Sequence, residues 1–301
     1  MNARPFLRRP NSDMKGESVK QAERECRRIA LSHYENFLVA SVLLPRRLKQ
    51  PFYNVYAFCR TADDLADESA TPALALNALS QCQTSLDATF AGHPPAGIFT
   101  ALANTIEQFR LDKQPFDDLL DAFRQDQQKT RYQTTRELLD YCRRSANPVG
   151  RIVLKLAAVD ADVADLERSD QICTGLQLAN FWQDVARDYA IGRIYLPQSE
   201  LRTLGVSEER FAEMIQQRST LPELKTLIQA ECDRAQTCFD RGAPLCDHVP
   251  KWLGRNLRLF VGGGRATLEA IRAIDFDVIR IRPRVSKGTQ AGLILRSLIG
   301  R

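Results

Sequence analysis

The chain has 301 residues, of which 44% are hydrophobic and 26% are charged, a composition typical of a globular protein and not of a disordered one. Its 15 glycines and 14 prolines are scattered without a period, which excludes collagen-like and low-complexity structure. The formal net charge of +5 is modest, and no apolar run approaches the ~18 residues that a membrane-spanning helix needs.

Apolar residues recur three and four positions apart along most of the chain, which is the period of an amphipathic helix. The sequence lacks alternating β patterns, and Pro45, Gly192 and Pro283 separate helical runs, with Ser207 as a candidate N-cap. The pattern predicts an all-α bundle that forms one domain. The predicted helices are, in chain order, 19–37, 45–68, 73–90, 116–128, 135–146 and 164–190, followed by helical stretches after 207 and after 250.

Several kinds of chemistry find no support in the sequence. The eight cysteines show no CxxC spacing and are expected to be reduced thiols of a cytoplasmic protein. The three histidines lack the spacing of a zinc site, and so small a number gives little support to a Ser-His-Asp hydrolase. The GGGR stretch at 262–265 follows no strand, so it predicts a helix break or a close packing contact and not a dinucleotide site.

The two ends of the chain differ in character. Residues 1–18 carry basic side chains without the apolar stretch of a secretion signal, and we expect a flexible tail before a domain that spans 19–301. Residues 251–301 hold eleven lysines and arginines against three acidic residues. This basic region suits an anionic substrate or the anionic surface of a membrane, although a solvated helix face would look the same. Nucleic-acid binding is disfavoured, because no zinc-finger, RRM or basic-zipper motif accompanies the charge.

Two acidic motifs carry the candidate chemistry. In the predicted helix 45–68, Asp63, Asp64 and Asp67 share one face, with Arg60 one turn earlier. Such a string is commonly a solvated surface, but a second motif at 180–188 spaces its oxygen side chains at successive i+4 steps beside apolar and aromatic residues. Two helices that present carboxylates across a cavity can hold Mg²⁺ ions bridged by a diphosphate. The predicted metal ligands are Asp63, Asp64, Asp67, Asn180, Asp184 and Asp188, and the five aspartates are also the predicted catalytic residues.

Metal ions on a diphosphate stabilise it as a leaving group, so the chemistry indicated is ionisation to a carbocation. Aromatic ring faces can stabilise such a cation. An aromatic residue at helical spacing can equally be an ordinary residue of the hydrophobic core. The aromatic residues beside the two motifs are Phe52, Tyr53, Tyr56, Phe58, Phe181 and Trp182.

Four ordered stretches carry a resemblance that covers nearly the whole chain: HYENF at 33–37, YAFCRTADDLADE at 56–68, YCRRSANPVGR at 141–151 and LQLANFWQDVARDYAIGRIYLP at 176–197. They resemble the motifs of the squalene and phytoene synthase family of head-to-head prenyl synthases, and within it the hydroxysqualene synthases of bacterial hopanoid synthesis. The resemblance implies an isoprenoid synthase fold, a single helical bundle around a central cavity, with Mg²⁺ as cofactor. It also implies a substrate-binding set of Arg60 at the diphosphate, Tyr141 and Gln177 at the cavity, and Asn180, His33 and Asn36.

The resemblance implies that presqualene diphosphate binds through Mg²⁺, loses diphosphate, rearranges as a cation and is captured by water to give hydroxysqualene. One alternative is a synthase of the same fold that joins two prenyl diphosphates into presqualene diphosphate or phytoene. Another is a non-catalytic relative that acts in assembly or lipid binding. The sequence departs from the family pattern at Tyr34, Asn36 and Gln183, which lie around the expected diphosphate pocket.

Overall fold

The computed structural model describes residues 12–32 and 44–299, and within these ranges the chain forms helices and no β-strand. The one β-type contact among these residues is an isolated parallel bridge between Arg131 and Ile194. The prediction of an all-α fold is confirmed. The helices are α1 (Ser12–Ser32), α3 (Arg46–Asp67), α4 (Pro72–Phe90), α5 (Ile98–Phe109), α6 (Gln114–Asp126), α7 (Thr135–Ser145), α8 (Asn147–Leu156), α9 (Val163–Gln183), α10 (Val185–Ala190), α11 (Gln198–Thr203), α12 (Glu208–Gln217), α13 (Pro222–Gly242), α14 (Leu245–His248), α15 (Lys251–Ala273) and α16 (Lys287–Ile299).

Side-chain caps fix the starts of four helices. Thr71, Thr134, Asp162 and Ser207 have extended backbone conformations, and the side-chain oxygen of each accepts a hydrogen bond from the backbone N–H three residues later. Each cap satisfies one of the N–H groups that the first turn of a helix leaves without a partner. The predicted N-cap at Ser207 is confirmed, with Arg210 N at 3.2 Å from its Oγ.

Helix α1 begins earlier than the sequence predicts. Residues 12–18 were expected in a flexible tail, yet the helix starts at Ser12. Extending a helix that already exists adds one hydrogen bond for each residue fixed, so its first turns need no apolar stripe of their own. The expected tail beyond this point, residues 1–11, lies outside the described residues.

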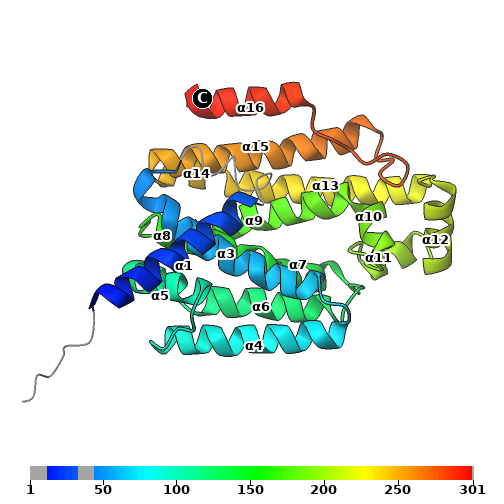
Figure 1. The fold of residues 1–301 in the computed structure, drawn as a ribbon. Coiled ribbons are helices and arrows are strands. Elements are labelled where there is room, and N and C mark those ends of the chain that lie inside the picture. Colours follow the sequence, from blue (N-terminus) through cyan, green and yellow to red (C-terminus); the bar gives the residue numbers. More distant parts are fainter. Residues whose placement is uncertain (1–11, 33–43, 300–301) are drawn as a thin grey trace, which may run out of the picture.

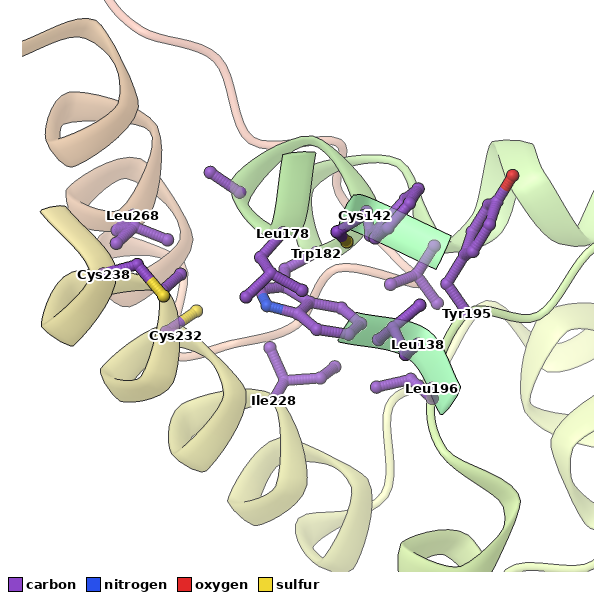
Figure 2. Close-up of a cluster of buried hydrophobic side chains, with 14 of the residues drawn as sticks. Leu138, Cys142, Leu178, Trp182, Tyr195, Leu196, Ile228, Cys232, Cys238 and Leu268 are labelled. Atoms are coloured by element: carbon purple, nitrogen blue, oxygen red, sulfur yellow. The ribbon is translucent and has the colours of Figure 1, made fainter. Parts of the chain in front are cut away.

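The buried hydrophobic side chains of the described residues form two cores, and Figure 1 shows the helices that supply them. One lies among α1, α3, α4, α5 and α6, where Phe58 contacts Phe99 and Phe116 at ring-centroid distances of 6.2 and 5.3 Å. The other lies among α7, α9, α13 and α15 and surrounds the fully buried Trp182 (Figure 2). Val153 of α8 and Trp252 of α15 pack against both cores, so the two halves of the bundle meet along these helices.

A mostly apolar cavity of about 390 Å³ lies between the two cores. Its wall comes from α3, α8, α9 and α15, and Phe52 and Trp252 meet there edge to face at 6.4 Å between ring centroids. We call it the apolar cavity. The expected bundle around a central cavity is present.

The glycines of the GGGR stretch do not break a helix. Gly262, Gly263 and Gly264 lie inside α15, which continues without interruption to Ala273. The expectation of close packing is correct for Gly264, because a Cβ atom there would overlap the ring of Phe239 on α13. Helix α16 follows and lies along α15 on the outside of the bundle (Figure 1).

Candidate functional site

The first acidic motif occupies the last turns of α3. Arg60 pairs with Asp63, Nη1 to Oδ2 at 3.0 Å, and with Asp64, and it lies 3.9 Å from Glu68. These side chains share one helix face, as their i, i+3 and i+4 spacing requires. Burial raises the pKa of Asp63, and the neighbouring Asp67 raises it further. The motif therefore carries more negative charge than Arg60 alone neutralises, part of it on half-buried side chains.

The second acidic motif lies across a helix junction. Helix α9 ends at Gln183, and α10 begins one residue after Asp184, whose backbone departs from helical geometry at φ −109° and ψ 17°. The hydrogen-bond ladder nevertheless continues, from Asp184 N to Asn180 O at 3.0 Å and from Asp188 N to Asp184 O at 2.8 Å. The predicted order of Asn180, Asp184 and Asp188 along one stripe is thus kept, although the helix is interrupted inside it.

Arginines partner Asp184, whereas Asp188 is less well neutralised. Arg282 reaches Asp184 from the segment before α16, with Nη2 3.1 Å from Oδ2, and Arg187 lies 3.6 Å away. Burial raises the pKa of Asp188 to about 7, and the charge of Asp184 adds to the rise. A carboxylate held in this way gains stability from an added cation.

Arg193 connects the two motifs and is absent from the residues predicted from the sequence. Its Nη2 lies 3.7 Å from Oδ1 of Asp67, while its backbone N–H donates to the carbonyl oxygen of Asp188 at 2.8 Å. The positive charge of Arg193 lowers the pKa values of both Asp63 and Asp188, against the larger effect of burial. The motifs of α3 and α10 therefore face a common space. The sequence feature that could have identified Arg193 is its place in GRIYLP, the end of the stretch 176–197 that resembles a family motif.

A second unpredicted residue, Asp126, lies at the end of α6 beside Tyr141. The Tyr141 hydroxyl donates to Oδ2 of Asp126 at 2.9 Å, and Oδ1 is buried without a hydrogen-bond partner. Burial raises the pKa of Asp126 to about 6, partly offset by the charge of Arg193. No spacing rule could reveal this carboxylate, because its neighbours come from α7 and from the turn after α10.

Four aromatic rings stack next to Asp126. Phe181 and Tyr195 lie 3.8 Å apart between ring centroids, and Tyr195 stacks on Tyr132 at 5.7 Å and on Tyr141 at 6.1 Å. All four rings are less than 9% exposed. Tyr141, which was expected to line the cavity, lies inside this stack, and its hydroxyl is directed to Asp126.

The structure separates the aromatic candidates into different roles. Phe52 and Tyr56 line the apolar cavity, where their rings are available to a ligand. Phe58 and Trp182 are 0% exposed and belong to the two cores, so they are structural residues, as Figure 2 shows for Trp182. Tyr53 is also buried. Helical spacing cannot distinguish these roles, because both cores and the cavity draw on the same helices.

Of the remaining predicted substrate-binding residues, two lie on α9 and two lie outside the described residues. Gln177 lies half-buried on α9, next to Leu176 of the cavity wall, and Asn180 lies exposed one turn beyond Leu176. His33 and Asn36 lie outside the described residues.

The donor set fits a divalent cation that is also held by a ligand. Carboxylate and amide oxygens are the ligands that Mg²⁺ prefers, and Mg²⁺ is usually bound through one or two carboxylates plus phosphate oxygens. Among the described residues, no three acidic, histidine or cysteine side chains converge closely enough to enclose an ion by themselves. The two separated motifs therefore suit ions that share a diphosphate between them.

Comparison with known proteins gives a consistent result. Residues 31–289 match the family model described as squalene/phytoene synthase. The chain is 30% identical over 284 residues to the 15-cis-phytoene synthase of Synechococcus elongatus, covering 89% of each protein. The crystal structure of squalene synthase HpnC from Alicyclobacillus acidocaldarius is similar with a TM-score of 0.80 and 41% identity, over 88% of this chain and 99% of that one. A dehydrosqualene synthase solved in complex with a ligand gives a TM-score of 0.82 at 25% identity, over 95% and 98% of the two chains.

Proposed function

The chain belongs to the squalene/phytoene synthase family, and from this premise we propose that it is a hydroxysqualene synthase. Members of the family act on prenyl diphosphates. The proposed reaction converts presqualene diphosphate and water into hydroxysqualene and diphosphate, with Mg²⁺ as cofactor, in squalene and hopanoid synthesis.

One structural relationship carries the proposal. Helix α3 places Cys59 in the wall of the apolar cavity and Asp63 one turn later, and α9 places Leu176 in the same wall and Asn180 one turn later. Both helices thus pass from an apolar wall to oxygen ligands, and Arg193 joins the two sets at that end. This arrangement suits a ligand with a long hydrocarbon part and a diphosphate head.

The residues of this chain have distinct proposed roles. Asp63, Asp64, Asp67, Asn180, Asp184 and Asp188 would hold Mg²⁺, which would supply Lewis-acid stabilisation of the departing diphosphate. Arg60 and Arg193 neutralise diphosphate charge from the protein side. The carbon–oxygen bond breaks with its electron pair on diphosphate, and Phe52 and Tyr56 present ring faces to the cation that remains. After rearrangement, water forms the new carbon–oxygen bond and gives its proton to diphosphate.

Head-to-head condensation is a second candidate, favoured by relatives described as phytoene synthases. In that reaction two prenyl diphosphates are joined into presqualene diphosphate or phytoene. A non-catalytic role in assembly or lipid binding is less well supported, because clustered and partly buried carboxylates bring no benefit to a scaffold.

Product analysis tests the proposal. We expect purified protein with Mg²⁺ to consume presqualene diphosphate at the same rate with and without NADPH and to give a C30 alcohol. In ¹⁸O-labelled water the alcohol should carry the label. An NADPH-dependent hydrocarbon or an unlabelled alcohol would contradict the proposal, and condensation of farnesyl diphosphate alone would favour the second candidate.

We also propose that the protein is cytoplasmic and contacts the anionic inner surface of the membrane through its basic C-terminal region. Across the described helices, none combines the length and the apolarity that a membrane span requires. Arg280, Arg284 and Lys287 are exposed around the start of α16 and supply the positive charge. A substrate with a C30 hydrocarbon chain gives such contact a purpose.

A further inference from the structure

Three consecutive glycines within α15 need an explanation, because glycine is among the poorest helix formers. Gly264 gives room to the ring of Phe239, and a Cβ atom at Gly262 would lie 2.8 Å from Cδ2 of Leu293 on α16. Gly263 differs from both, since a Cβ atom there would meet no heavy atom within 4 Å. Helix packing therefore explains two of the glycines and leaves Gly263 unexplained.

Gly263 lines a second cavity, also of about 390 Å³, between α9, α15 and α16. Phe260, Gly263, Gly264 and Thr267 follow each other at helical spacing, so one face of α15 forms this part of the wall. Figure 1 shows α16 lying along α15, and the α16 part of the wall includes Gln290. An added side chain at Gly263 would occupy space that the cavity now keeps open.

The second cavity adjoins both parts of the candidate site. Asn180 of the second acidic motif lies in its wall, and Leu176 and Phe260 line both this cavity and the apolar cavity. The two spaces thus share these two side chains as part of their walls. Whatever fills the second cavity lies next to the hydrocarbon part of a ligand and next to its diphosphate end.

Water suits the second cavity better than the apolar one. Asn180, Thr267 and Gln290 contribute polar groups to its wall. The Thr267 hydroxyl donates to the carbonyl oxygen of Gly263 at 3.2 Å, which leaves its oxygen free to accept a hydrogen bond from water. An ordered water needs two to four polar partners and about 30 Å³ of space, and the cavity offers both. Asn180 and Gln290 are exposed, so water can reach this cavity from the solvent.

We propose that Gly263 is a specificity-determining residue that keeps this cavity open for the water that captures the cation. This inference rests on the proposed function. The oxygen lone pair of that water forms the carbon–oxygen bond, and its proton passes to the diphosphate released in the same turnover. With the cavity filled, the cation loses a proton to diphosphate instead, and the product is a C30 hydrocarbon.

Graded substitution tests the role of Gly263. With presqualene diphosphate in ¹⁸O-labelled water, we expect the labelled fraction of C30 product to fall from wild type to Gly263→Ala and by about tenfold in Gly263→Leu. Diphosphate release should stay within about twofold of wild type, because ionisation is untouched. Both variants should melt no lower than wild type, since alanine and leucine favour a helix over glycine.

Gly292→Leu is the matched control. Gly292 lies inside α16, where a Cβ atom also meets nothing within 4 Å, and it is not part of the cavity wall. Its labelled fraction should equal that of wild type. An unchanged fraction in both Gly263 variants would overturn the inference and leave the proposed function intact. A wild-type protein that forms no labelled alcohol would overturn both.

Discussion

The guanidinium of Arg282 and the carboxylate of Asp184 form an ion pair, with Nη2 of Arg282 3.1 Å from Oδ2 of Asp184, between residues 98 positions apart. The amide of Gln183 donates to the carbonyl oxygen of Pro283 at 2.9 Å and holds the same two segments together. A cation that binds Asp184 must compete with this guanidinium.

Replacing Arg282 should therefore strengthen the response to metal. In Arg282→Gln we expect Mg²⁺ together with inorganic diphosphate to raise the melting temperature more than in wild type, because the competing charge is gone. Differential scanning fluorimetry over a Mg²⁺ titration measures this shift. Arg280→Gln is the control, since Arg280 is exposed and lies 4.0 Å from Asp277 instead. Equal shifts in Arg282→Gln and wild type would show that Mg²⁺ does not bind at Asp184.

Each acidic motif should be needed for turnover. Asp64→Asn and Asp184→Asn should each lower kcat about a thousandfold, because ~4 kcal/mol of lost charge stabilisation gives that factor. Circular dichroism should show unchanged helix content, and the exposed Asp233→Asn should retain activity. Near wild-type rates with unchanged Mg²⁺ dependence in either motif variant would remove that carboxylate from the site.

Glu231 should make stability depend on pH. Its side chain is 0% exposed, and burial raises its pKa from 4.5 to about 7, with Glu200 adding to the rise and Arg234 opposing it. The folded protein therefore keeps a proton that the unfolded chain loses near pH 4.5, so this contribution to stability disappears as the pH rises through about 7.

Glu231→Gln keeps the neutral form at every pH, so its melting temperature should fall less than that of wild type between about pH 5 and about pH 8. Glu213→Gln, an exposed substitution on α12, provides the control and should follow wild type. Parallel melting curves for Glu231→Gln and wild type would mean that Glu231 does not titrate in this range.

The exposed basic residues near α16 should govern binding to anionic lipid. The combined Arg280→Gln, Arg284→Gln and Lys287→Gln variant should bind phosphatidylserine vesicles about a hundredfold more weakly at low salt, because each basic side chain contributes ~1 kcal/mol. Cosedimentation at low and high salt measures the effect.

The control for this experiment is a triple variant that loses three positive charges from α1 instead of from the start of α16. Arg24, Arg27 and Arg28 are all exposed, and their replacement by glutamine should leave vesicle binding unchanged. An equal loss in this control, or equal binding of wild type to neutral and anionic vesicles, would argue against a specific docking surface near α16.

Sequence alone determined the features that depend on neighbours within one helical turn. The apolar period of 3.6 residues predicted the helices, and the spacing of Asp63, Asp64 and Asp67 placed them on one face. The cap at Ser207 followed from local chemistry in the same way. These properties survive in the fold because each helix keeps its own hydrogen bonds wherever it packs.

Only the tertiary structure decided which distant groups meet. Arg193 and Arg282 reach the acidic motifs through turns whose paths no periodicity encodes, and Asp126 receives the Tyr141 hydroxyl from another helix. Packing likewise placed Phe52 in the cavity and Phe58 in a core, six residues apart on one helix. It also kept α15 continuous through Gly263, because contacts with α13 and α16 outweigh the weak helix propensity of glycine.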